Sequence, residues 1–68
     1  MSNDLQVLSA ARHHLALFKV ANPELASDAQ DFYDLMVDEI NAGESPDNEA
    51  ELFYNSLAEL LNPTQDEY

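Results

Sequence analysis

Two residue pairs, Asn22-Pro23 and Ser45-Pro46, divide the sequence into three segments of helical length. Asn and Ser cap helix N-termini well, and proline suits the first helical position because the N–H that it lacks would have no partner there. The single glycine, Gly43, comes shortly before the second pair. A residue with left-handed geometry commonly ends a helix, and glycine adopts that geometry most easily. These signals predict a helix start after each proline and a helix end before Gly43.

The third segment ends at Asn62-Pro63, because the residue before a proline avoids helical geometry. No segment alternates between apolar and polar residues with the period of two that a strand requires. Short connections place sequential helices side by side and antiparallel. We therefore predict an all-α fold, a small three-helix bundle in which residues 1–68 form one domain. The predicted helices cover about residues 4–20, 23–41 and 46–62, and a loose tail covers 63–68.

Each segment carries apolar residues at steps of three and four, which is the spacing of one buried helix face. Three further apolar residues of the first segment, Val7, Leu17 and Val20, lie outside its stripe. A helix that is apolar on more than one side is usually packed between neighbours, and we expect this of the first helix. The stripes are Leu5, Leu8, Ala11, Leu15 and Phe18; Leu25, Ala29, Phe32, Met36 and Ile40; and Ala50, Phe53, Leu57, Leu60 and Leu61.

The charge is strongly unbalanced, with 14 acidic residues against two basic ones and a net charge of -12. The net charge is +1 for residues 1–22, -7 for residues 23–44 and -6 for residues 45–68. Such charge can prevent folding, but a hydrophobic content of 46% and the regular apolar spacing argue against disorder. Nucleic acid and anionic membranes would repel this chain, so we expect it to bind neither directly. No apolar run is long enough to span a membrane.

The second helix is sharply divided between an apolar stripe and an acidic side. At 100° per residue its carboxylates fall within an arc of about 140°, and Leu35 falls among them. Like charges three or four residues apart cost about 0.2–0.5 kcal/mol per pair, so this arrangement carries a stability cost without a local benefit. Leu35 either contacts a partner or covers a neighbouring helix. We predict a partner-binding surface made of Glu24, Asp28, Asp31, Asp34, Leu35, Asp38 and Glu39, which we call the acidic arc.

Sites for metals, cofactors and catalysis are not predicted. His13 and His14 point about 100° apart on a helix and do not converge on one ion. Asp47, Glu49 and Glu51 alternate like the start of a calcium loop, but the glycine and the final glutamate of that loop are missing. There is no cysteine, no Ser/His/Asp arrangement and no glycine-rich phosphate loop. We therefore expect a protein that binds a partner and is not an enzyme.

The charge pattern favours an inhibitor that mimics nucleic-acid charge and occupies a basic surface meant for nucleic acid. In size and charge the chain is similar to the small acidic inhibitors that phages and mobile elements direct against host nucleases, CRISPR complexes and transcription enzymes. The resemblance is one of composition and includes no shared motif. It implies a basic nucleic-acid-binding protein or complex as partner, and the cytoplasm, that of the host for a phage protein, as location.

Three alternatives remain open at this point. An antitoxin or immunity protein that covers a basic toxin would depend more on apolar anchors such as Leu35, Leu52, Tyr33 and Tyr54. A structural or assembly subunit, or a homodimeric adaptor, would bury surplus apolar surface against a second copy. General adaptation to high salt would give an acidic, lysine-poor surface with no specific partner.

Overall fold

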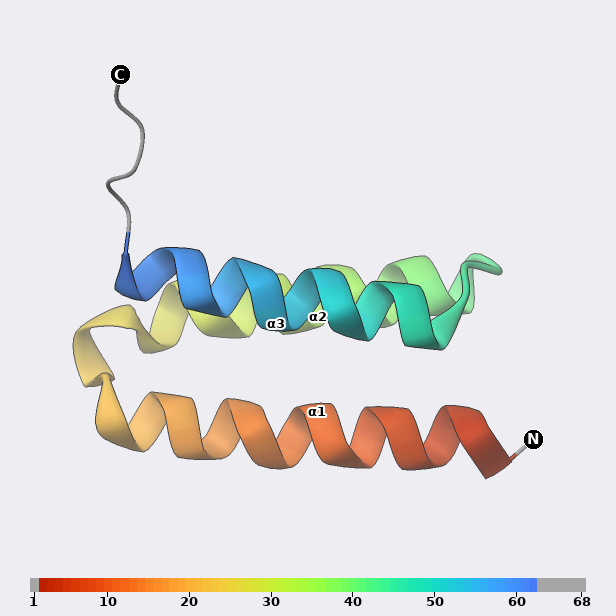
Figure 1. Cartoon of the computed structure of the whole chain (residues 1–68), viewed down its shortest axis with the longest axis horizontal. Helices are drawn as coiled ribbons and strands as arrows, with labels where there is room; N and C mark the ends of the chain where they lie inside the picture. The colour runs from red at the N-terminus through yellow and green to blue at the C-terminus, as the bar shows by residue number, and fades with distance from the viewer. Residues whose placement is uncertain (1, 63–68) are drawn as a thin grey trace, which may run out of the picture.

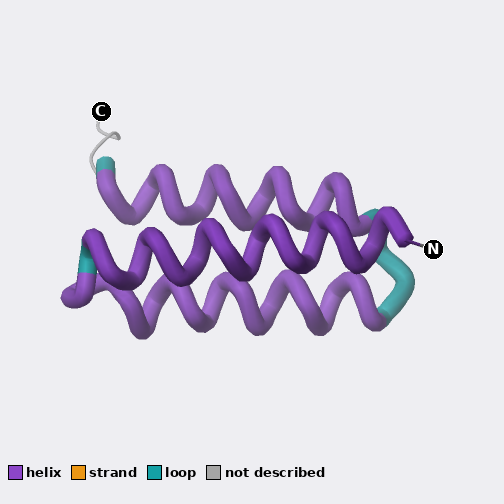
Figure 2. Tube along the Cα trace, turned by 90° about the horizontal axis from the view of Figure 1, so that it is seen from below, coloured by secondary structure: helices purple, strands orange, loops and turns teal. Residues whose placement is uncertain are grey.

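The predicted three-helix bundle is confirmed by a computed structural model, which describes residues 2–62. Helix α1 spans Ser2–Ala21, α2 spans Ala26–Asn41 and α3 spans Pro46–Leu61, and a short 3-10 helix, η1, spans Pro23–Leu25. Sequential helices run antiparallel, so α1 and α3 point the same way (Figure 1). Seen from below, α1 lies in front with α2 and α3 on either side of it (Figure 2). The predicted tail, 63–68, lies outside the described residues.

The connection between α1 and α2 differs from the prediction. The helix expected over 23–41 begins as the 3-10 turn η1, and α2 itself starts only at Ala26. Asn22 does not cap with its side chain. Its Nδ2 donates instead to the carbonyl oxygen of Phe18 at 3.2 Å, and its backbone N–H donates to the same oxygen at 2.8 Å. The last carbonyls of a helix lack intrahelical partners, so Asn22 serves the end of α1 rather than the start of α2.

The turn between α2 and α3 follows the prediction closely. Gly43 has a φ of +112°, and its N–H donates to the carbonyl of Ile40 at 3.0 Å. The N–H of Glu44 donates to the carbonyl of Glu39 at 3.0 Å. These two bonds make the paired C-terminal closure that a glycine with positive φ permits. Ser45 then caps α3, because its Oγ accepts a hydrogen bond from the N–H of Asn48 at 3.5 Å.

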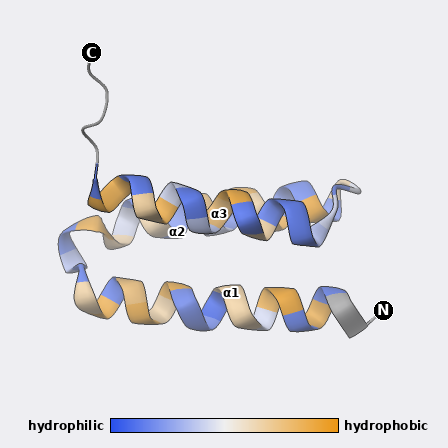
Figure 3. Cartoon of the chain, viewed as in Figure 1, coloured by the Kyte–Doolittle hydropathy of each residue, from blue (hydrophilic) through white to orange (hydrophobic). Residues whose placement is uncertain are grey.

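The core lies along the line where the three helices meet, and each helix supplies small and large apolar side chains to it. Hydrophobic and hydrophilic residues are both spread along the whole length of each helix, as expected where one face packs and the other is exposed (Figure 3). No polar or charged side chain among the described residues is buried, so the charge of this part of the chain lies at the surface. The buried residues are Ala11, Leu15 and Phe18 of α1, Ala29 and Met36 of α2, and Ala50, Phe53 and Leu57 of α3.

Some apolar residues lie elsewhere than predicted. Leu5 and Leu61 belong to the predicted stripes, yet each is more than half exposed because it lies near a helix end, where the neighbours no longer cover it. Val7 does pack against the core. The expectation that α1 packs between neighbours is confirmed, because α1 contacts both α2 and α3, but Leu17 and Val20 do not take part in that packing and are exposed. In a bundle of three helices, the outer face of α1 has no fourth helix against it.

Aromatic rings tie α3 to both other helices. Tyr33 of α2 meets Phe53 edge to face, with ring centroids 5.8 Å apart. His14 of α1 meets Tyr54 edge to face at 4.9 Å. Such pairs stabilise a fold beyond the area that they bury. Both tyrosines are half-buried and engaged in packing, which makes them less available as anchors for a partner.

Within residues 2–62, none of the helices combines the length and apolarity needed to cross a bilayer.

Candidate partner-binding surface

The acidic arc is almost entirely exposed in the structure. Glu24 lies on η1, and the other members lie on α2. Glu39 is half-buried, which fits its position toward α3 at the edge of the arc. The other five acidic residues of the arc have exposed side chains: Glu24, Asp28, Asp31, Asp34 and Asp38.

The spacing of these carboxylates can be compared with that of nucleic-acid phosphates. From Asp28 to Asp38 the carboxylates are separated by three or four residues, which is a mean rise of about 5 Å along the helix. One strand of duplex DNA presents a charge about every 3.4 Å of helix axis. The arc therefore has about two-thirds of the linear charge density of a single strand.

Lys19, the single lysine of the chain, is connected to the acidic arc through the side-chain amide of Gln30. Lys19 Nζ of α1 donates to Gln30 Oε1 at 2.7 Å, and Gln30 Nε2 donates to Asp34 Oδ1 at 3.0 Å. This relay links α1 to α2 and fixes the orientation of Asp34 by a neutral group. Asp34 therefore has a hydrogen-bond partner on its own helix, whereas no hydrogen bond or ion pair engages the side chain of Asp31 or Asp38 within the described part of the chain.

The surroundings of the arc are also acidic. Neither α2 nor α3 has a basic residue in its last turn, where a positive charge would favour the helix dipole. Beyond Lys19 the sequence contains no lysine or arginine. Helix α3 has exposed carboxylates of its own at Asp47, Glu51 and Glu59. A basic surface would find no competing positive charge on these two helices.

Leu35 is both exposed and in contact with the neighbouring helix. It is 55% exposed, and it lines a shallow groove of about 260 Å³ between α2 and α3. Leu52, on the α3 side of this groove, is 57% exposed. We call this the α2/α3 groove; its lining residues are Phe32, Leu35, Met36, Glu49, Leu52, Phe53 and Ser56. The sequence suggested both Leu35 and Leu52 as apolar anchors, but nothing in it indicated that they line one groove.

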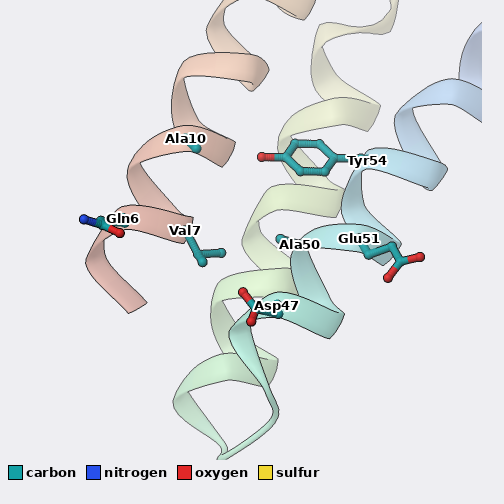
Figure 4. A pocket seen from close by; sticks show the side chains of 7 residues that line it. All are labelled: Gln6, Val7, Ala10, Asp47, Ala50, Glu51 and Tyr54. Carbon is teal, nitrogen blue, oxygen red and sulfur yellow. The ribbon is translucent and has the colours of Figure 1, made fainter. Parts of the chain in front are cut away.

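A second groove lies on the other side of α3 and was not predicted. It has a volume of about 390 Å³ and opens between the N-terminal halves of α1 and α3. Tyr54 reaches from α3 toward α1, and Val7 points from α1 toward α3 (Figure 4). Ala10 and Ala50 are too small to fill the space between these helices, and Asp47 lies at its edge. We call this the α1/α3 groove; none of its lining residues belongs to the acidic arc.

The two histidines of α1 lie at the surface and differ in what they contact. Both His13 and His14 are exposed. His14 packs against the ring of Tyr54 of α3. Within residues 2–62, no three His, Asp or Glu side chains are grouped as ligands of a metal ion would be. The predictions on metals and cofactors rest on the sequence pattern alone.

Comparison with protein families, curated proteins and solved structures gives no match to this chain. The site must therefore be interpreted from its own chemistry. That chemistry is an exposed acidic helix face beside a groove with two half-exposed leucines.

Proposed function

We propose that this protein is an inhibitor that occupies a basic, nucleic-acid-binding surface of another protein by imitating nucleic-acid charge. The observation that carries the proposal is the acidic arc: carboxylates about 5 Å apart along an exposed helix, with no lysine or arginine on α2 or α3. A basic groove attracts such a surface from a distance and binds it at sites meant for phosphates. The proposed partner is a nucleic-acid-binding protein or complex in the cytoplasm.

The cost of the arc supports a role for the charge itself. The pairs 28/31, 31/34 and 34/38 are like-charged neighbours on α2, and each costs about 0.2–0.5 kcal/mol. A chain of 68 residues has a small core and little stability to spare. Interspersed lysines would remove this cost and gain ion pairs. Their absence from residues 20–68 indicates that the negative surface has a purpose.

A charge reversal on α2 tests this proposal. The variant is Asp31→Lys with Asp38→Lys; both residues are exposed, and neither takes part in the Lys19–Gln30–Asp34 relay. We expect helix content to be retained and stability to rise slightly, because like-charge pairs are relieved. Capture of the partner from a lysate of the source organism should nevertheless fall by about tenfold or more, mainly through slower association at low salt.

The matched control is Glu51→Lys with Glu59→Lys, which makes the same change in net charge on exposed positions of α3. This control should retain most of the binding. The captured protein should bind nucleic acid by itself, and added duplex DNA should release it. Equal capture by the parent and both variants would show that the charge serves general solvation. Selective loss in the α3 variant would show that the arc is the wrong surface.

The structure also offers an observation in favour of the antitoxin or immunity alternative. Leu35 and Leu52 are more than half exposed and flank one groove, so apolar anchors accompany the charge. In that case the partner is a basic toxin, and binding depends more on these leucines than on the carboxylates. The captured protein would then be toxic when produced alone, and high salt would weaken its binding only modestly.

A further inference from the structure

The α2/α3 groove combines an apolar floor with an acidic border. Phe32, Met36 and Phe53 supply the floor, while Leu35 and Leu52 stand on opposite sides of it. Because Leu35 and Leu52 expose 55% and 57% of their surfaces, they present apolar area that the bundle itself does not cover. Leu5, Leu17, Val20 and Leu61 are also exposed, but Leu35 and Leu52 differ from them because they line one groove together. Contiguous exposed apolar area of this kind is typical of a protein-binding surface.

The border of this groove is negative on both helices. Asp31, Asp38 and Glu39 lie three or four residues from Leu35, which places them on the same side of α2. Across the groove, Glu49 belongs to the lining itself. The complementary partner therefore carries an apolar ridge with Lys or Arg on both flanks.

The backbone chemistry of the groove determines what shape that partner takes. The groove is formed by the middle parts of two helices, whose N–H and C=O groups are already used within α2 and α3. An extended peptide would find no backbone partners there and would lose hydrogen bonds to water when it covered the apolar floor. A helix satisfies its own backbone and can place side chains from successive turns into such a groove.

We propose that the α2/α3 groove is the docking site for a basic amphipathic helix of the partner, which places an apolar side chain between Leu35 and Leu52. This inference rests on the proposed function and adds to it the structural element that is recognised. A second copy of this chain is a poor occupant, because each copy brings its own net charge of -12. The acidic arc attracts the helix, and the groove gives it a fixed register.

A synthetic peptide provides a direct test. The probe is a fluorescein-labelled helix of about 18 residues, with leucines along one face and lysines on both flanks. A permuted peptide of the same composition spreads its leucines around the helix. Binding is measured by fluorescence anisotropy at about 150 mM NaCl, where long-range attraction is largely screened. We expect the amphipathic peptide to bind at least about tenfold more tightly than the permuted one.

The variant Leu35→Ala with Leu52→Ala should weaken binding of the amphipathic peptide by about tenfold or more. The matched control is Leu5→Ala with Leu17→Ala, which removes leucines of 71% and 58% exposure outside the groove. We expect this control to bind within about twofold of the parent. In spectra of the ¹⁵N-labelled protein, the peptide should shift the amides of the α2/α3 groove and leave Val7 and Ala10 of the α1/α3 groove unchanged.

Three results would overturn the proposal. If the Leu35/Leu52 variant binds the peptide as tightly as the parent does, charge alone holds the peptide. That result would leave the proposed function standing. Shifts confined to the α1/α3 groove would place the helix elsewhere. A dimer of the parent that disappears in the Leu35/Leu52 variant would assign the groove to a second copy. The proposed function is tested separately by the charge variants and the natural partner, so the two failures are distinguishable.

Discussion

At the scale of single residues, Gly43 has the most demanding backbone in the described part of the chain. Its φ of +112° is strained for residues with a Cβ, whereas glycine adopts it freely. An added Cβ would meet nothing within 4 Å, so the constraint comes from the backbone and not from crowding. The closure of α2, through the bonds from Gly43 to Ile40 and from Glu44 to Glu39, depends on this conformation.

We expect Gly43→Ala to lower the free energy of unfolding by about 1–2 kcal/mol, the usual cost of left-handed geometry for an L-residue. Gly43→Asn should cost less, because Asn tolerates this region better. The neighbouring Ala42 has an ordinary helical φ of -82°, so Ala42→Ser should change stability by no more than about 0.5 kcal/mol. Urea unfolding followed by circular dichroism measures all three. An unchanged midpoint for Gly43→Ala would contradict the strain argument.

At the scale of helices, two similar start signals, Asn22-Pro23 and Ser45-Pro46, have different outcomes. Ser45 lies in the extended region and caps α3 through Asn48, as the pair Ser45-Pro46 predicts. Asn22 bonds backward to Phe18, and the chain enters α2 through η1 without a side-chain cap. An Asn side chain can donate as well as accept, so Asn22 gives the carbonyl of Phe18 a second hydrogen bond. This backward bond competes with capping the helix ahead.

The cap of α3 should have a measurable effect on stability. We expect Ser45→Ala to lower the free energy of unfolding by about 0.5–1 kcal/mol, toward the lower end for a lost N-cap because the bond to Asn48 is long. Ser45→Thr should retain most of the cap, since Thr also accepts from the same N–H. Thermal melts of the two variants, compared with the parent, provide the measurement. Equal losses for Ala and Thr would show that Ser45 acts through packing instead.

At the scale of the whole molecule, the charge is separated between helices. Residues 1–22 carry a net charge of +1, while the rest of the chain carries -13. The Cα positions extend 40 Å along the longest axis and 14 Å along the shortest, so the carboxylates of α2 and α3 are held within a small volume. Repulsion among these carboxylates therefore destabilises the folded state, and added salt screens that repulsion.

We expect the melting temperature to rise by several degrees between about 20 mM and about 500 mM NaCl, because added salt shortens the screening length. A relief of about 1 kcal/mol corresponds to about 4–8 °C in a domain of this size. The variant Asp31→Lys with Asp38→Lys should show a smaller rise, since part of its repulsion is already removed. A parent protein whose melting temperature does not respond to salt would mean that the repulsion has little influence on folding.

What the sequence determined was mostly local. The end of α2 at Gly43 and the start of α3 at Ser45-Pro46 depend on backbone geometry within a few residues, so the residue types alone predict them. The exposure of Asp31 and Asp38 could also be predicted, because a carboxylate opposite an apolar stripe has no reason to be buried. The same holds for the all-α class, which follows from the helical periodicity of all three segments.

Only the tertiary structure decided how far each helix covers its neighbours. Leu5 and Leu57 both fit an apolar stripe, yet Leu5 is exposed and Leu57 is buried, because coverage depends on where the adjacent helices begin and end. Leu35 and Leu52 are 17 positions apart and become the two sides of one groove when α2 and α3 pack antiparallel. Helical periodicity gives the direction of a side chain around its own axis, but only packing determines what it meets there.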